Sequence, residues 1–171
     1  MWTLVLAFVD IALHRRGPQH LPASGFLFGL VVAVHILIGI VSLQLVVPLS
    51  RALVVVLGDT ALMLGFLALL LKAFGRDARF LQTATAICGT EALFNALSVP
   101  LVATRPEDAA GAPAEGAGAL LLLGLFCWSV DVSGYVVSRA IERPYVVGLS
   151  IMVAYLLLTL RLEAALFPPA S

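Results

Sequence analysis

Residues 82–100 read QTATAICGTEALFNALSVP, a stretch long and apolar enough to cross a bilayer, with Glu91 near its middle. At helical spacing one face of this stretch is small and polar, and it consists of Ala84, Cys88, Glu91, Asn95 and Ser98. Because a carboxylate is costly to expose to lipid, we expect this face to turn toward other helices or a water-filled cavity. The stretch therefore predicts a helical membrane protein with a polar interior.

The composition of the whole chain points to the same class of protein. Of its 171 residues, 61% are hydrophobic and 12% are charged, and the mean hydropathy is +1.08. A soluble domain of this size does not need so much apolar surface, whereas the lipid-facing side of a helical bundle does. Ten basic and ten acidic residues cancel, so no nucleic-acid partner is expected. Cys88 and Cys127 form no CxxC pair, which disfavours a disulfide framework or a thiolate zinc site.

Apolar stretches along the chain predict an all-α bundle of five transmembrane helices. These helices are expected at residues 25–48, 52–71, 82–100, 119–138 and 145–162. The chain then divides into an N-terminal helix (1–16), a turn-rich linker (17–24), the five-helix domain (25–163) and a C-terminal tail (164–171). Ser24 is expected to cap the first spanning helix.

The N-terminal segment, residues 1–16, is apolar but too short to span a membrane. A narrow polar strip runs along it and consists of Thr3, Asp10 and His14. This pattern predicts an amphipathic helix in the membrane interface, with Trp2 as an interfacial aromatic and Arg15 and Arg16 at the headgroups. A helix packed on the bundle would explain the same pattern equally well.

The distribution of basic residues predicts the orientation of the bundle. With five spans, seven basic residues lie on the N-terminal side of the membrane: Arg15, Arg16, Lys72, Arg76, Arg79, Arg139 and Arg143. Three lie on the opposite side: Arg51, Arg105 and Arg161. The excess on one side places the N-terminus in the cytoplasm and the C-terminus outside, together with the acidic loop 104–118.

Ionisable residues from four predicted spans fall at a similar depth. Counting 1.5 Å per residue places His35, Asp59, Glu91 and Asp131 about 12 to 20 Å from the cytoplasmic side. An isolated charge there costs at least about 2.5 kcal/mol. We therefore expect the four to converge, with at least one carboxyl neutral at pH 7. The expected hydrogen-bond partners are Gln44, Thr60, Thr90, Asn95 and Ser133. Such a layer either fixes which helix faces meet, or serves a proton, cation or polar ligand, or meets a partner subunit.

Small residues in the first two spans predict close contacts between helices. Gly25 and Gly29 form a GxxxG pattern, and Gly58 precedes Asp59 in the second span.

Motifs of enzymes are absent from the sequence. It contains no HExxH, GxSxG, P-loop or Gly-rich dinucleotide motif. Val56-Leu-Gly-Asp59 resembles half of the GxGD motif of intramembrane proteases, but Val56 replaces the first glycine. Asp131 follows Val130 rather than the tyrosine of the companion motif. We therefore expect no enzymatic activity, no metal and no cofactor.

Two spans resemble bacterial members of the Yip family, the Rab/Ypt-interacting-protein type of membrane domain. Arg79-Phe-Leu-Gln-Thr-Ala-Thr-Ala-Ile-Cys-Gly-Thr, with Pro100 downstream, is similar to the family's F-x-Q entry into its central helix. Phe126-Cys-Trp-Ser129, leading to Ser138-Arg-Ala, is similar to its W-S span. The resemblance covers about residues 25–162 and implies a compact five-span domain without catalytic residues.

We therefore expect a Yip-like scaffold or accessory subunit in the inner membrane, in contact with lipid and with a membrane protein partner or a second copy. The alternative is a small proton- or cation-coupled transport component that uses the carboxylate and histidine layer. The scaffold requires that layer to be closed and internally paired, whereas transport requires it to be hydrated and open to one side.

Overall fold

A computed structural model describes residues 2–103 and 116–166 of the chain. These residues contain helices and no strands, which confirms the predicted all-α architecture of five long apolar helices and a short N-terminal helix. The helices are α1 (Trp2–Ala12), α2 (Gly25–Leu43), α3 (Leu49–Ala73), α4 (Phe80–Ala103), α5 (Gly116–Ile141) and α6 (Tyr145–Leu166), with short 3₁₀ turns η1 (Pro18–His20) and η2 (Asp77–Arg79). Arg105, nearly all of the acidic loop and most of the tail lie outside the described residues.

All five long helices have the length and composition needed to cross a membrane. Large apolar side chains remain exposed along their outer faces, for example Phe26 on α2, Leu69 on α3 and Leu120 on α5. In water so much exposed apolar surface would promote aggregation. In a bilayer the same surface contacts the lipid chains. The chain is therefore a multi-pass membrane protein.

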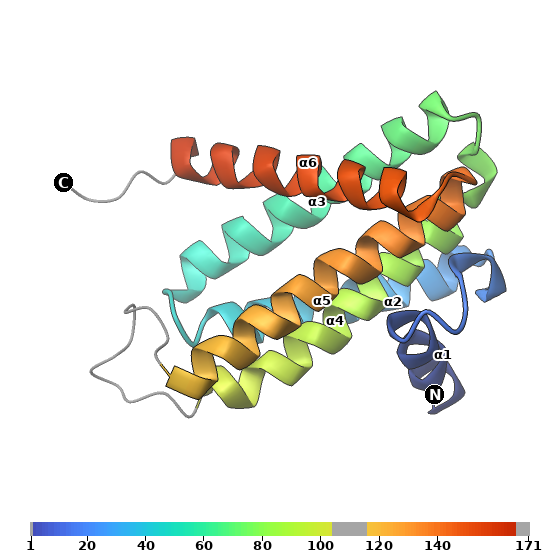
Figure 1. Ribbon diagram of the computed structural model, residues 1–171. Coiled ribbons are helices and arrows are strands. Elements are labelled where there is room, and N and C mark those ends of the chain that lie inside the picture. Colours follow the sequence, from blue (N-terminus) through green and yellow to red (C-terminus); the bar gives the residue numbers. More distant parts are fainter. Residues whose placement is uncertain (1, 104–115, 167–171) are drawn as a thin grey trace.

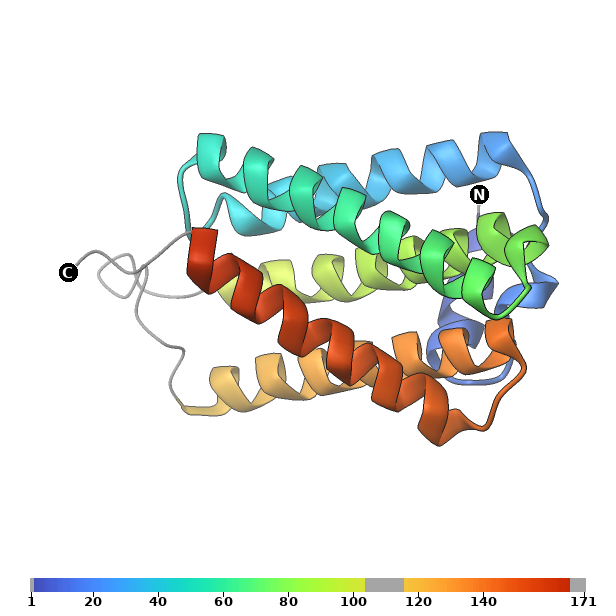
Figure 2. The ribbon, with the colours of Figure 1, turned by 90° about the horizontal axis from the view of Figure 1, so that it is seen from above.

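Helices α2, α4 and α5 lie side by side, and α3 and α6 lie over the same face of this layer (Figures 1 and 2). Helix α4 is central, since it contacts α1, α2, α3 and α5. Every residue from Thr83 to Thr90 on α4 is buried. This run combines small residues with threonines, so neighbouring helices can approach closely around α4.

The buried threonines of α4 satisfy their hydroxyls within their own helix. Thr83, Thr85 and Thr90 donate hydrogen bonds to the carbonyl oxygens of Arg79, Leu81 and Ala86, at 2.6 to 2.9 Å. Each acceptor lies four residues earlier, which is a common arrangement for hydroxyls buried in membrane helices. The polar character of this stretch therefore demands no partner from another helix.

Glycines permit two close helix contacts, one between α5 and α6 and one between α4 and α1. A Cβ atom on Gly148 of α6 would lie 2.3 Å from the carbonyl oxygen of Gly134 on α5, so the two backbones touch. A Cβ atom on Gly89 of α4 would lie 2.2 Å from Cε1 of Phe8 on α1. A Cβ atom on any of the three glycines expected to pack closely would meet no atom within 4 Å; these are Gly25, Gly29 and Gly58. Helix packing inside the described chain does not use these three.

Helix α1 packs on the bundle with one face and leaves another apolar face outward. Its buried residues are Phe8, Ile11 and Ala12, while Trp2 is 73% exposed and Val5 and Leu6 are also exposed. The carbonyl of Ala12 accepts a hydrogen bond from Trp128 Nε1 at 3.0 Å. The inner face thus fits the packed alternative, and the outer face has the chemistry of a membrane interface.

The segment between α1 and α2 is held in place rather than extended. Gly17, Pro18 and Leu21 are buried, and Gln82 donates a hydrogen bond to the Leu21 carbonyl at 2.7 Å. Arg15 and Arg16 are exposed, and Arg16 pairs with Asp10 at 3.2 Å. The Ser24 hydroxyl accepts a hydrogen bond from the Leu27 N–H at 3.3 Å, which confirms the predicted cap of α2.

Candidate functional site

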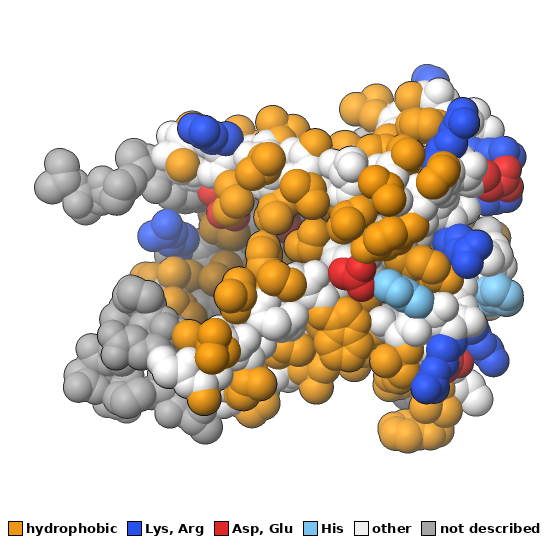
Figure 3. Space-filling model, in the orientation of Figure 1, with side chains coloured by type: hydrophobic (Ala, Val, Ile, Leu, Met, Phe, Trp, Pro, Cys, Tyr) orange, Lys and Arg blue, Asp and Glu red, His pale blue; other side chains and the backbone are white. Residues whose placement is uncertain are grey.

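A cavity with a volume of about 330 Å³ lies inside the bundle and is lined by residues from all five long helices. It brings together four of the five residues predicted for the polar layer: His35 on α2, Asp59 on α3, and Glu91 and Asn95 on α4. The surface is also recessed between α6 and α5 in the space-filling view (Figure 3). Helix α4 contributes two of these side chains because Glu91 and Asn95 are one helical turn apart.

His35 and Glu91 lie beside one another in the cavity. His35 Nε2 lies 3.9 Å from Glu91 Oε2, and the two side chains are 6% and 26% exposed. The other ring nitrogen of His35, Nδ1, is buried and has no hydrogen-bond partner among the described residues. Buried polar atoms are nearly always paired with protein or ordered water. Nδ1 is therefore an unpaired buried atom, and the ring nitrogen that lies beside the cavity carboxylate is Nε2.

Helices α5 and α6 complete the wall with Ser133, which was expected as a hydrogen-bond partner of the layer, and with three polar residues that were not predicted. Ser129 and Ser133 come from α5, and Tyr155 and Thr159 come from α6. The Tyr155 hydroxyl is buried without a partner among the described residues, and its ring stacks on Phe66 of α3 with centroids 4.6 Å apart. A signal was present in the sequence, because Tyr155 and Thr159 are four residues apart and share one helix face.

The cavity is acidic. Asp59 is exposed at its edge, whereas Glu91 lies further inside. None of the described residues that line the cavity is Lys or Arg. Two carboxylates, with one imidazole and no Lys or Arg among the described lining residues, favour a positively charged occupant or an exchangeable proton.

Three of the expected hydrogen-bond partners of the layer do not join it. The Thr60 hydroxyl donates to the Val56 carbonyl at 2.7 Å, and Thr90 bonds Ala86 within α4. Gln44 is exposed at the C-terminal end of α2. The threonines meet their hydrogen-bonding needs within one helix, so residue type and depth alone did not identify the lining of the cavity.

Asp131 belongs to a different cluster. Its carboxylate accepts a hydrogen bond from the Tyr145 hydroxyl, and its Oδ2 atom lies 3.3 Å from Nε2 of His14. The His14 ring packs on Tyr135 with centroids 4.3 Å apart. Residues two apart on a helix do not share a face. Asp131 therefore points away from the cavity that Ser129 and Ser133 line.

A second cavity, of about 520 Å³, adjoins the first. Val55 lines both, and the second is also lined by Arg51 at the start of α3 and Glu163 near the end of α6. The ends of α2 and α6 and the beginning of α3 lie on this side of the bundle (Figure 1). The two cavities together extend from the middle of the bundle toward its C-terminal end.

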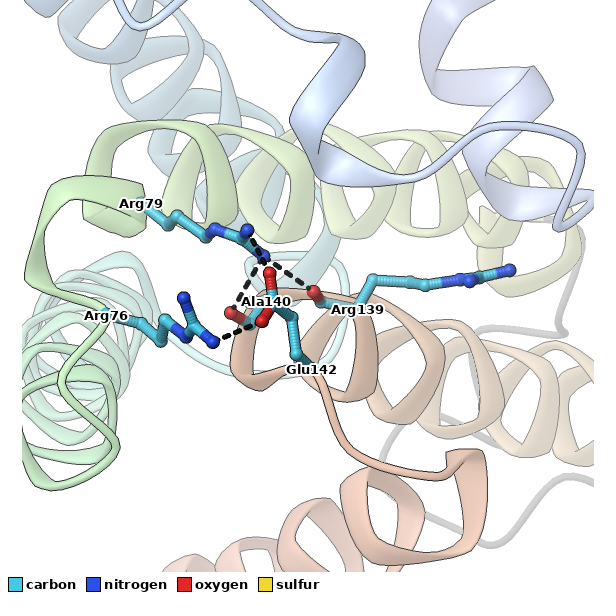
Figure 4. Close-up of polar contacts among 5 residues, drawn as sticks. All are labelled: Arg76, Arg79, Arg139, Ala140 and Glu142. Carbon is cyan, nitrogen blue, oxygen red and sulfur yellow. Dashed lines mark hydrogen bonds and ion pairs between the residues drawn. The ribbon is translucent and has the colours of Figure 1, made fainter.

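The opposite end of the bundle is closed by an ionic cluster (Figure 4). Glu142, just after α5, accepts hydrogen bonds from both Arg76 and Arg79. Arg79 also donates to the carbonyls of Arg139 and Ala140 at 3.1 and 3.3 Å. These contacts join the α3–α4 connection to the C-terminal end of α5, whose last carbonyls favour a cation. Ion pairs thus join the helices at the basic end of the bundle, and the two cavities lie in its middle and toward its other end.

Comparisons with protein families, curated proteins and solved structures gave no match to this chain. The resemblance to the Yip family therefore stays a prediction from sequence motifs. Among the described residues, no group of three His, Cys, Asp or Glu side chains lies close enough together to hold a metal ion.

Proposed function

We propose that this protein is a non-enzymatic component of proton- or cation-coupled transport in the inner membrane. Glu91 is the residue that exchanges the proton or contacts the cation. The observation that carries the proposal is the acidic cavity that Glu91 shares with His35, Asp59 and Asn95.

The pairing of the polar groups favours transport over a purely structural role. Structural polar layers in membranes gain stability by forming hydrogen bonds between helices, about 0.6 kcal/mol each on average. In this cavity His35 Nδ1 and the Tyr155 hydroxyl make no such bond within the described chain. Groups kept unpaired at this depth reduce stability, so the layer lacks the full internal pairing that a purely structural role requires.

The route and the orientation follow from the two ends of the bundle. The second cavity, with Arg51 and Glu163, leads from the first toward the C-terminal end. The opposite end carries the excess of basic residues, so it faces the cytoplasm in this proposal. The central cavity is then reached from the outer side of the inner membrane, while the cluster around Glu142 closes the cytoplasmic side.

The test is ion flux in liposomes that contain the purified protein. An imposed pH gradient, followed with an enclosed pH-sensitive dye, is expected to collapse faster than in empty liposomes. Glu91→Gln keeps the shape of the side chain but cannot ionise, and we expect it to slow the collapse at least about tenfold, as for loss of an essential general acid or base.

The matched control is Asp131→Asn, which changes a carboxylate on an adjacent helix outside the cavity. It is expected to keep the wild-type rate. A wild-type rate equal to that of empty liposomes, or equal rates for wild type and Glu91→Gln, would rule out this function.

The second candidate is the Yip-like scaffold or accessory subunit. It is favoured by Gly25 and Gly29, which form an open small-residue face on the outside of α2. Such a face allows another helix to approach closely. In this case Gly29→Leu would abolish cross-linked dimers or co-purification of a stoichiometric membrane partner. Gly65→Leu, at an equally open position on α3, would leave them unchanged.

A further inference from the structure

We infer that the central cavity binds a small organic ammonium ion that carries an apolar or aromatic body. This inference rests on the proposed function, because it names the class of cation that the same cavity would take. It is drawn from the combination of carboxylates and fixed aromatic rings around one space.

The charge of the cavity determines the sign of the charge that its ligand carries. Asp59 and Glu91 line it from two helices, and no Lys or Arg is among its described lining residues. A cation that enters the cavity is attracted by these carboxylates. The basic side chain among the described lining residues is His35, whose Nε2 atom lies 3.9 Å from Glu91 Oε2. In a site shielded from water this attraction is much stronger than at a surface.

The aromatic walls set the shape of the ligand. Phe94, Phe126 and Tyr155 line the cavity, and two of these rings are held in place by neighbours. Tyr155 stacks on Phe66, and Phe94 packs against Trp128 with centroids 5.2 Å apart. Aromatic faces attract ammonium groups, and rings that are already fixed lose little freedom on binding.

Size and geometry favour an organic ion over a metal ion. The volume of about 330 Å³ lies at the lower end of the range for small-molecule sites. No three metal-binding side chains among the described residues converge on one point. A molecule with a charged head and an apolar body can reach a carboxylate and the aromatic wall at once, which a compact inorganic ion cannot do.

Two polar side chains line the cavity from helices on different sides of it, His35 on α2 and Tyr155 on α6. Nε2 of His35 lies 3.9 Å from Glu91 Oε2 and can hydrogen-bond at the carboxylate that attracts the ligand. The Nδ1 atom of His35 and the Tyr155 hydroxyl are themselves buried and have no partner in the described chain, so these two atoms do not face the ligand.

The test uses calorimetric titration of the full chain in detergent at pH 7 with 2-phenylethylamine, which is an ammonium ion at this pH. The matched probes are 2-phenylethanol, which has the same shape without charge, phenylacetate, which has the opposite charge, and potassium chloride. We expect saturable binding of the amine. Binding of the alcohol and of phenylacetate should be weaker by at least about tenfold, the size expected for one charged contact of 1.4 kcal/mol or more.

Glu91→Gln and Asp59→Asn should each weaken amine binding by a similar factor, while Asp131→Asn should leave it unchanged. Size-exclusion profiles show whether each variant is folded, and the comparison of probes on the wild-type protein decides the matter if a variant is not. Equal binding of the alcohol and the amine, or full amine binding by both cavity variants, overturns the inference.

Flux measurements separate this inference from the proposed function. Glu91-dependent proton flux without amine binding overturns the organic ligand and leaves the transport proposal in place. Amine binding without flux supports the ligand and overturns transport, and absence of both overturns both.

Discussion

Glu91 and Asp131 are carboxylates at similar predicted depth on adjacent helices, yet their surroundings differ. Asp131 accepts a hydrogen bond from Tyr145 and lies 3.3 Å from His14, so it joins α5 to α6 and to the end of α1. Glu91 lies in a cavity, where its Oε2 atom is 3.9 Å from Nε2 of His35. The comparison shows that the polar contacts of Asp131 hold helices together, whereas Glu91 lines a cavity that can take a ligand or an ion.

This difference implies opposite consequences for stability. A hydrogen bond that connects elements contributes about 1 kcal/mol net, and removing one partner leaves the other unsatisfied. A carboxyl without full pairing contributes little and is retained at a cost to stability. Substitutions around Asp131 should therefore reduce stability, and substitutions in the cavity should reduce function.

The largest loss of stability is expected when α5 and α6, which Asp131 and Tyr145 connect, are forced apart. Gly148→Leu would place side-chain atoms where the carbonyl of Gly134 already lies. We expect a loss of about 3 kcal/mol, since overpacking against backbone cannot be relieved by rotating a side chain. The melting temperature in detergent should fall by roughly 6 to 12 °C. Gly58→Leu, which meets open space, is the control, and an equal fall in both would refute the close contact.

A milder way to break this connection between α5 and α6 is Asp131→Ala. The change leaves the Tyr145 hydroxyl and the His14 ring without their acceptor, and we expect a loss of about 1 to 2 kcal/mol. Helix α1 should also become more accessible to protease. Ser129→Ala, on the cavity side of the same helix, should have no such effect. Unchanged protection of α1 in Asp131→Ala would argue against its anchoring role.

The ionic cluster of Arg76, Arg79 and Glu142 adds a third, more exposed set of polar contacts to the comparison of Asp131 with Glu91. Arg76, Arg79 and Glu142 are each about one-third to one-half exposed, so Glu142→Gln should cost less than about 1 kcal/mol. Thermal unfolding at low salt and at 1 M salt checks this, because screening at 1 M should remove most of the difference. A loss that is both larger and independent of salt would mean that packing, not charge, closes this end.

The smallest effect on stability is expected for Glu91→Gln. The new side chain has nearly the same shape and removes a charge from the membrane interior, so stability should stay within about 0.5 kcal/mol or rise. Thermal unfolding beside Asp131→Asn measures the contrast directly. A loss of more than about 1 kcal/mol in Glu91→Gln would show that Glu91 also holds the fold together.

The five spanning helices could be predicted from the sequence because lipid imposes both their length and their composition. Depth along each helix could also be counted, and it brought His35, Asp59 and Glu91 to one cavity. What could not be derived was the rotation of each helix about its axis. Helix α5 has polar residues on two sides, so the sequence did not decide whether the side with Asp131 or the side with Ser133 faces the cavity.

Close contacts were harder still to predict. The GxxxG pattern of Gly25 and Gly29 pointed to helix packing, yet the glycines that permit close approach are Gly89, Gly134 and Gly148. A glycine matters only when a neighbour needs its space, and that depends on where another helix crosses. The contribution of Tyr155 was missed for a related reason, since an aromatic residue in an apolar span suggests packing before it suggests a cavity wall.

The contact between Gly134 and Gly148 also bears on the order in which the molecule assembles. Only residues 142–144 separate α5 from α6, so bringing these helices together closes a short loop at little cost in chain entropy. The hydrogen bonds that fix the end of α1 join residues 116 and 121 positions apart. Pairing of α5 with α6 therefore costs less chain entropy than docking of α1, whose partners Trp128 and Tyr135 on α5 lie more than a hundred residues away along the chain.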